Sequence, residues 1–540
     1  MSDEDSQPPE YEYDRRHATG EFPAFQPPPP PAAQVPEPPA WQTGADALPV
    51  RRRGIASVAI GLPLAVAIAL AVVFSPVGDW FRVTGTPTAQ AAEPAAQAAG
   101  GAPAGGEAAP GAGKAAVNLL RSAVFVQSNF PEGNFVVAYS RDAAGRLSKV
   151  GEYPTGGNGS GSFEDASNGL VLGSSEGELA PINNTVVNGT PKGDLLFALN
   201  AGSNTVTVFK VEATGLRRVG VTPTGGEKPV SITVNRGLVY VLNSGEFDDR
   251  LLPEGVAVPP ENCTTGQLPT LTGFKVGKDG VLTPLPGSTR LLSGEKDSGC
   301  AQVSFTPNGK TLVVTERIAG KSEPAAPGGF AKGAILTYPV RSDGRLGTVT
   351  LNEPVGNGPF GFTFTRDGKI IMTEQNGAFS NPAGGYMASY RMNPPETQVD
   401  PNFGIPNVAL TPVSQPLKTN TADPCWVVLT GDQKLAFVTS AGGDVSSYSV
   451  GFDGKLTLLH KSATAADGQD TNADRLQFGA TDLSLSADSR YLYQLHSFEG
   501  RIYVFLINGN GTLTFVETQD AFDLGTRPRN EGSPFGIVAN

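Results

Sequence analysis

Seven polar residues recur at one position of a repeated pattern, the end of the second strand in each copy. They are Ser128, Asn200, Asn243, Glu316, Glu374, Ser440 and His496. Two carboxylates and an imidazole near a channel could provide a general base, a cation-binding pair or a sugar-binding ring. We therefore take Glu316, Glu374 and His496, with the adjacent Arg317, as candidate catalytic residues. The alternative is that the Asn and Ser side chains bond their own turns and that the glutamates are solvated.

The three cysteines, Cys263, Cys300 and Cys425, are too few for a disulfide framework. Cys425 opens a predicted inner strand, and we expect a buried structural thiol there because no histidine is near it in sequence. Cys263 and Cys300 belong to neighbouring repeats and could pair in an oxidising compartment. The sequence contains no P-loop and no H-x-x-x-H spacing. We predict no cofactor and no bound metal.

The repeats themselves would position these side chains. An aromatic residue ends a short alternating strand seven times, at Tyr139, Phe209, Phe274, Tyr338, Tyr390, Tyr448 and Phe505. In six copies a glycine follows six residues later, at Gly145, Gly215, Gly280, Gly344, Gly454 and Gly511. Such turns join two strands into a hairpin, because only residues that tolerate positive φ match the strand twist. A second pair of strands precedes most hairpins, as in "VSFTPNGKTLVVTE".

Four antiparallel strands in each of seven repeats predict an all-β, seven-bladed β-propeller over residues 118–540. The final residues, "SPFGIVAN" (533–540), read as an innermost strand with nothing after it to pair with. The first repeat, which starts at "SAVFVQSN", lacks an innermost strand. We predict that the C-terminal strand closes the first blade.

The extra length of the chain falls between the repeated strands. If the strands of each blade run from the inside (a) to the outside (d), the b-to-c and d-to-a connections share one face. We assign to that face the insertions 151–183, 245–270, 317–332, 463–479 and 519–532. Long loops over one mouth of a rigid ring usually carry the functional site. We expect the site on this face.

The N-terminal part differs in composition from the repeats. Residues 1–53 are rich in Pro, Glu and Ala and are expected to be a disordered cytoplasmic tail. Residues 54–76 begin with an uncharged apolar run, long enough to cross a membrane as a helix, and Arg51 to Arg53 precede it. The positive-inside rule then keeps the N-terminus cytoplasmic and places the propeller outside the membrane, after an Ala/Pro/Gly-rich linker over 77–117. The alternative is a signal peptide cleaved after "AQA" (89–91), which would give a secreted protein.

The charge of the chain limits its partners. The formal net charge is -12 and the folded part has no block of Lys and Arg, so there is no electrostatic basis for nucleic-acid binding. We expect no nucleic-acid partner and a monomer.

Several stretches carry a family resemblance, notably "GEKPVSITVNRGLVYVLNSG", "VSFTPNGKTLVVTER", "GPFGFTFTRDGKIIMTEQNG" and "DPCWVVLTGDQKLAFVTS". Over residues 122–540 the chain resembles the seven-bladed lactonase family, which contains propeller 6-phosphogluconolactonases and muconate lactonising enzymes. The resemblance implies the fold and a His, Arg and Glu set at the channel mouth. Here Ala301 stands where the family histidine would lie, and Gln375 where the arginine would lie. Glu316, Arg317, Glu374 and His496 are the residues that could replace them.

Two functions remain open from the sequence. The first is an extracytoplasmic, membrane-tethered propeller that hydrolyses or binds a lactone, a sugar acid or a similar small polar molecule at the loop-rich mouth. The second is a non-catalytic scaffold that binds a protein or a cell-envelope glycan. The fold alone cannot choose, because propellers serve as enzymes and as binding platforms.

Overall fold

The computed structural model describes residues 117–164, 166–174, 193–245, 267–295, 298–319, 332–375, 384–393, 408–419, 424–440, 445–464, 480–497, 499–523 and 534–540. All of them belong to the second of two compact units, Gly106–Asn540. The predicted tail, the apolar run 54–76 and the linker up to residue 116 lie outside the described residues. In the described ranges every regular element is a strand, so no helix there could span a membrane.

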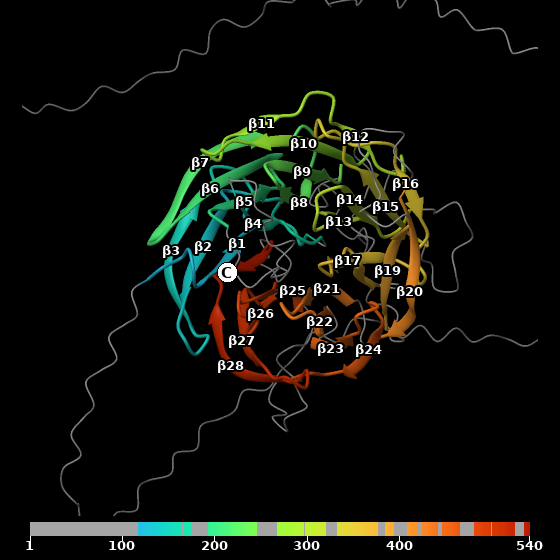
Figure 1. Ribbon diagram of the computed structural model, residues 1–540. Coiled ribbons are helices and arrows are strands. Elements are labelled where there is room, and N and C mark those ends of the chain that lie inside the picture. The colour runs from blue at the N-terminus through green and yellow to red at the C-terminus, as the bar shows by residue number, and fades with distance from the viewer. Residues whose placement is uncertain are drawn as a thin grey trace, which may run out of the picture. The chain divides into compact units, whose positions relative to one another are not determined.

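Seven antiparallel sheets follow one another around a ring, one for each sequence repeat (Figure 1). We number them as blades 1 to 7 and letter their strands a to d from the innermost outward. Blade 1 contains β29 (Ile537–Ala539), β1 (Ala123–Gln127), β2 (Phe135–Arg141) and β3 (Leu147–Pro154). Blade 2 contains β4 (Leu170–Gly173), β5 (Leu195–Asn200), β6 (Thr205–Glu212) and β7 (Gly215–Pro223). Blade 3 contains β8 (Pro229–Asn235), β9 (Leu238–Asn243), β10 (Thr270–Val276), β11 (Leu282–Pro284) and a fifth strand, β12 (Arg290–Leu291).

The remaining blades have four strands each, in sequence order from the inside outward. Blade 4 contains β13 (Cys300–Phe305), β14 (Thr311–Glu316), β15 (Ala334–Pro339) and β16 (Thr350–Asn352). Blade 5 contains β17 (Pro359–Phe364), β18 (Ile370–Glu374), β19 (Tyr386–Asn393) and β20 (Ala409–Lys418). Blade 6 contains β21 (Pro424–Leu429), β22 (Leu435–Ser440), β23 (Val445–Val450) and β24 (Leu456–His460). Blade 7 contains β25 (Ala480–Leu485), β26 (Tyr491–His496), β27 (Arg501–Ile507) and β28 (Leu513–Asp520).

The C-terminal strand closes the ring, as predicted. β29 pairs antiparallel with β1, with Phe125 opposite Val538, and the C-terminus lies beside β1 in Figure 1. Asn540 fixes the two ends together, because its Oδ1 accepts the N–H of Ala123 at 2.7 Å and its Nδ2 donates to the carbonyl of Leu119 at 2.7 Å. The first blade is therefore built from both ends of the described chain.

Neighbouring innermost strands are joined by polar side chains. Each innermost strand has one edge without a paired strand, and its N–H groups need other acceptors. Side chains of the preceding blade accept them: Asp482 from Ile537 at 3.0 Å, Ser484 from Ala539 at 2.9 Å, Ser231 from Val303 at 3.0 Å and Gln302 from Phe362 at 2.9 Å. Polar residues inside these buried strands thus hold the ring together.

The aromatic residues that mark the repeats lie in the packing layers between blades, and none of the seven is more than 1% exposed. The hairpin turns follow the prediction at five of the six glycines, where φ lies between 85° and 89°: Gly145, Gly280, Gly344, Gly454 and Gly511. Gly215 is the exception. It begins β7 and pairs with Glu212 across a two-residue turn, so it needs no positive φ.

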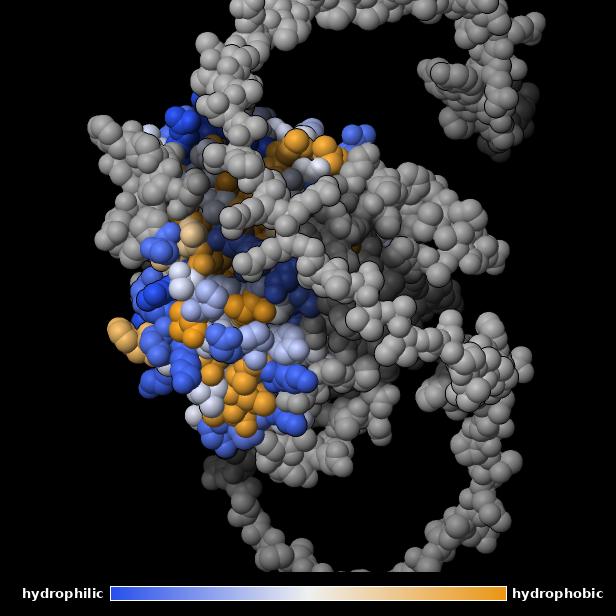
Figure 2. All heavy atoms as spheres, turned by 90° about the vertical axis from the view of Figure 1, so that its right-hand side faces the viewer, coloured by the Kyte–Doolittle hydropathy of each residue, from blue (hydrophilic) through white to orange (hydrophobic). Residues whose placement is uncertain are grey.

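The outermost strands differ in length, since β20 has ten residues and β16 has three. Leu351 of β16 is 55% exposed. On the side that carries β16 and β20, small apolar patches alternate with hydrophilic side chains (Figure 2). Short edge strands with mixed polarity discourage pairing between molecules.

The connections correct one part of the loop assignment. The insertions 245–270, 317–332, 463–479 and 519–532 fall in b-to-c or d-to-a connections, as expected. The insertion 151–183 does not fall wholly on that face. It includes the end of β3 and all of β4, and its last residues precede β5 in an a-to-b connection. The reason is that β4 ends early, at Gly173, which the sequence pattern did not reveal.

Candidate functional site

The innermost strands of blades 4, 5 and 6 begin with bulges on the face of the b-to-c connections. Their pairing with the second strand shifts between Cys300 and Gln302, between Pro359 and Phe362, and between Pro424 and Val427. A bulge leaves residues out of the ladder and re-aims their side chains. Four residues released in this way pack together as a cluster separate from the cores between blades: Ala301, Phe360, Cys425 and Trp426.

Two further side chains join this cluster from the ends of the second strands. Arg317, next to Glu316, places its guanidinium carbon 5.3 Å from the centre of the Phe360 ring. Its Nη1 donates a hydrogen bond to Oε1 of Gln375 at 3.2 Å. The Phe360 and Trp426 rings meet edge to face with centroids 5.2 Å apart. We call Arg317, Phe360, Gln375 and Trp426 the donor cluster.

Two buried donors of this cluster, Nε2 of Gln375 and Nε1 of Trp426, have no hydrogen-bond partner among the described residues. The residues are only 4% and 6% exposed. The Gln375 amide is oriented by Arg317, because its oxygen accepts from the guanidinium and its nitrogen is the end left open. A buried donor without an acceptor costs about 1–3 kcal/mol, so each such group calls for an explanation. An acceptor supplied from outside the chain explains both.

Glu316 and Glu374 end the second strands of blades 4 and 5, at the equivalent positions that the sequence predicted. Glu316 accepts hydrogen bonds from the hydroxyls of Ser298 at 2.5 Å and Ser293 at 3.1 Å. Glu374 accepts the N–H of Gly356 at 2.6 Å and the hydroxyl of Tyr390. Both carboxyls are fully buried, which excludes the solvated alternative.

Burial dominates the electrostatics of the two carboxyls. Desolvation raises the pKa of Glu316 to about 7, although the hydrogen bonds from Ser298 and Ser293 act in the opposite direction. Desolvation likewise raises the pKa of Glu374 to about 7, against the hydrogen bonds from Tyr390 and Gly356. A carboxyl with a pKa near 7 is present in both forms at neutral pH and can give or take a proton. Their catalytic role stays a prediction.

His496 lies elsewhere on the ring. It ends β26 in blade 7, two blades beyond Glu374, and is fully buried. Its ring lies 6.1 Å from that of Tyr503. Glu316, Arg317 and Glu374 therefore belong to adjoining blades, whereas no contact described in the structure joins His496 to them.

The place at which the resemblance puts a histidine is covered by the chain itself. Ser167, in the connection between blades 1 and 2, donates its N–H to the carbonyl of Ala301 at 2.9 Å. Asn168 accepts the N–H of Ile232 at 3.0 Å, so this connection runs past blade 3 to blade 4. Ala166, Ser167 and Asn168 are each at most 5% exposed. At this position the chain has a packed connection instead of a general base.

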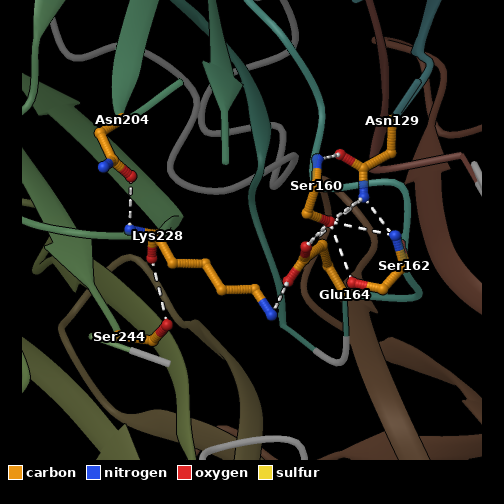
Figure 3. Close-up of polar contacts among 7 residues, drawn as sticks. All are labelled: Asn129, Ser160, Ser162, Glu164, Asn204, Lys228 and Ser244. Carbon is orange, nitrogen blue, oxygen red and sulfur yellow. Dashed lines mark hydrogen bonds and ion pairs between the residues drawn. The ribbon is translucent and has the colours of Figure 1, made fainter. Parts of the chain in front are cut away.

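A second polar cluster lies on the same face at blades 1 to 3, and none of its residues is among the candidates from the sequence. Lys228 Nζ lies 3.6 Å from Oε2 of Glu164, and the two side chains are 10% and 2% exposed. Asn129 Nδ2 donates to Ser160 Oγ at 2.9 Å and to the carbonyl of Ser162 at 2.8 Å, while the Ser160 hydroxyl donates to Glu164. We call these five residues the ion-pair network. Figure 3 shows Lys228 extended toward Glu164.

The backbone of Lys228 is held as firmly as its side chain. Its N–H donates to Oδ1 of Asn204 at 2.7 Å, and its carbonyl accepts the Ser244 hydroxyl at 3.1 Å (Figure 3). These bonds stabilise a φ of 48°, which is uncommon for a residue with a side chain. Lys228, the lysine in "GEKPV", thus connects three blades. Its place directly before an inner strand is the only feature of the sequence that could have pointed to this network.

Of the two cysteines that could pair, the structure describes only Cys300. Cys300 is a free, buried thiol, and its nearest polar partner is the Ser298 hydroxyl at 3.9 Å. Cys300 starts β13 and faces Glu316 in the ladder, while Cys263 lies outside the described residues. Cys425 is fully buried, as expected. Among the described residues no three His, Cys, Asp or Glu side chains form a group that could hold a metal ion.

Comparison with known proteins reveals the fold. No family model and no curated protein matches the sequence. Among solved structures, a candidate 6-phosphogluconolactonase of Bacteroides fragilis superposes with a TM-score of 0.50 and 14% identity, over 77% of this chain and 98% of that one. The periplasmic gluconolactonase of Pseudomonas aeruginosa gives a TM-score of 0.50 and 13% identity, over 77% of this chain and 98% of that one. The chain has the propeller-lactonase fold. At these identities the likeness extends to the fold and not to the activity.

Within that fold the sequence located the two carboxyls and Arg317 but not the other two donors. Trp426 is not among the sequence candidates, and Gln375 is named only as the residue in place of the family arginine. A tryptophan at the start of an innermost strand, in a chain with three tryptophans, is the signal that could have pointed to the site.

Proposed function

We propose that this chain is an extracytoplasmic propeller, tethered by the apolar segment 54–76, that takes a small polar molecule of the lactone or sugar-acid type. The site is the donor cluster, on the face that carries the b-to-c connections. The observation that supports it best is the pair of buried, unpartnered donors at Gln375 and Trp426 beside the charge of Arg317. The periplasmic gluconolactonase with the same fold adds weight to this compartment and ligand class.

Hydrolysis would use the carboxyls behind the donor cluster. Opening a lactone requires a water that attacks the carbonyl carbon, a base that takes its proton, and donors for the oxyanion that forms. Glu374 or Glu316, with pKa values near 7, would take the proton and return it to the ring oxygen as the carbon–oxygen bond breaks. Arg317 would stabilise the oxyanion.

A non-catalytic function is the second candidate, and the covered Ala301 favours it. The Ser167 N–H occupies the Ala301 carbonyl where the resemblance puts a histidine. A propeller without that base could serve as a scaffold that binds a protein or a cell-envelope glycan. This function would also suit a chain held at the membrane.

The test is a panel of lactones and sugar acids offered to the full chain in mild detergent, with turnover and binding measured separately. We expect binding of at least one member, and Glu374→Gln to abolish any turnover without lowering the melting temperature. Glu316→Gln, Arg317→Lys and His496→Ala extend the series, and Asn200→Ala, at the equivalent strand end of blade 2, is the matched control. Binding without turnover would support binding of the small molecule and not its hydrolysis. Neither binding nor turnover by any member would overturn the proposal.

A further inference from the structure

The donor cluster offers hydrogen-bond donors and a positive charge, and this restricts the chemical class of its ligand. Arg317 has only donors and is always charged, and Trp426 has a single donor. The Gln375 oxygen is already used by Arg317, so its open end is also a donor. Nothing in the cluster remains to accept a hydrogen bond from a ligand hydroxyl.

The surroundings of the donor cluster strengthen its preference for a ligand that accepts hydrogen bonds and carries negative charge. Ala301, Phe360 and Cys425 pack beside Trp426 and leave little water at the cluster. Electrostatic attraction is stronger where water is excluded. The neighbouring acids are turned to other partners, Glu316 to Ser293 and Ser298 and Glu374 to Tyr390 and Gly356. The charged group that belongs to the cluster itself is the guanidinium of Arg317, which lies against Phe360 and Gln375.

The bulges fix the spacing of these donors. Gly361 allows blades 5 and 6 to approach, because a Cβ there would lie 2.4 Å from the carbonyl oxygen of Cys425. The donors thus come from three successive blades that cannot separate without disturbing the ring. A preorganised set of donors binds an anion with little loss of conformational entropy.

We infer that the cluster binds the carboxylate of an open-chain sugar acid, and that it prefers this anion to the uncharged lactone ring. A carboxylate offers two oxygens with about four acceptor positions, enough for the guanidinium, the Gln375 amide and the Trp426 indole. The inference rests on the proposed function and narrows it. The chain recognises the hydrolysed acid, so a reaction that opens lactones would have to supply its ligand, whether another protein or this one catalyses it.

Calorimetric titration of the full chain with sodium gluconate, gluconolactone and the uncharged polyol glucitol tests this. Gluconate should bind at least tenfold more tightly than glucitol or the lactone. Gluconate should also shift the fluorescence of the wild-type protein, and this shift should be lost in Trp426→Phe. The fluorescence test can also be made on the wild-type protein alone, where the shift with gluconate must exceed the shift with glucitol. It therefore does not require that a substitution be tolerated.

Two substitutions and one control locate the site. Trp426→Phe removes the indole donor, and Gln375→Glu keeps an acceptor for Arg317 but places a negative charge against the ligand. Each should weaken gluconate binding at least tenfold with the ring still folded. Tyr448→Phe removes a buried hydroxyl in blade 6, outside the cluster, and should leave the affinity unchanged.

The outcomes separate this inference from the proposed function. Turnover or binding of a lactone, with no binding of gluconate, would overturn the inference and leave the proposed function standing. Equal affinities for gluconate and glucitol, or wild-type gluconate affinity in Gln375→Glu, would also overturn it. Failure of every probe to bind or react would overturn both.

Discussion

Two polar clusters lie on the same face of the propeller and differ in one respect. In the ion-pair network at blades 1 to 3, Lys228 meets Glu164, and Asn129 and Ser160 complete the remaining hydrogen bonds. In the donor cluster at blades 4 to 6, Gln375 and Trp426 keep buried donors for which the described residues supply no acceptor. The first cluster is complete within the protein, and the second is complete only with something added.

Whether a cluster satisfies its own hydrogen bonds separates a structural from a functional role better than the types of its residues do. A buried Lys–Glu pair is a conspicuous candidate for chemistry, yet here it fixes the connection that covers Ala301. An amide and an indole are less conspicuous, yet they carry the unsatisfied hydrogen-bonding capacity. Buried groups without partners are rare in folded proteins, and ligand sites are one of the few places that tolerate them.

The largest expected effect concerns the side of the ring that contains the network. Deleting residues 533–540 removes Phe535, Ile537 and Val538, all at most 2% exposed, and opens the ring between blades 7 and 1. Burying three such side chains contributes about 5–9 kcal/mol, so the melting temperature should fall sharply. Calorimetry on the deleted and full chains checks this. An unchanged melting temperature would contradict the closed ring.

The next effect comes from breaking the ion pair itself. Glu164→Gln or Lys228→Met leaves a buried charge without its partner and should lower the free energy of unfolding by about 3–5 kcal/mol. The double variant removes both charges and should recover most of that loss. Urea denaturation of the three variants measures it, and gluconate affinity should change less than threefold in each. Additive losses in the double variant would show that the two residues do not act as a pair.

The sequence predicted the fold well because its signals are local. Alternating strands, hairpin glycines and the unpaired "SPFGIVAN" depend on residues close in sequence or on a count of repeats. The strand ends that carry Glu316 and Glu374 were found in the same way. Each of these features follows from one repeat aligned on another.

The donor cluster could not be found by this reasoning, because it depends on bulges and on contacts between blades. Trp426 joins it only because the pairing of β21 shifts after Pro424, and Arg317 only because Phe360 lies beside it. The same limit applies to Cys300, since membership of neighbouring blades did not determine that this thiol would be free and lie beside Ser298.

A smaller effect compares single side chains in the two clusters. Asn129→Leu removes an amide that donates to Ser160 and Ser162, leaves their oxygens short of a donor, and should cost about 2–3 kcal/mol. Trp426→Phe removes an N–H that has no acceptor among the described residues and should cost about 1 kcal/mol or less, from packing alone. Chemical denaturation of both variants gives the comparison. A larger loss for Trp426→Phe would mean that the indole has a structural partner after all.

The smallest effect is on the pH dependence of stability. It concerns Glu374, the residue next to Gln375 of the donor cluster. The folded-state pKa of Glu374 is raised from 4.5 to about 7, so the folded protein holds a proton that the unfolded chain releases above about pH 4.5. Stability from this group is complete below pH 4.5 and is lost as the pH rises toward 7. The loss between pH 5 and 7 should be about 2 kcal/mol. Glu374→Gln should flatten the stability curve in that range, and Asp482→Asn, whose carboxyl also has a pKa raised to about 7 by burial, should flatten it further. A curve that keeps its slope in Glu374→Gln would show that this carboxyl is already ionised at pH 5, and would contradict the pKa near 7 on which the hydrolytic form of the proposal relies.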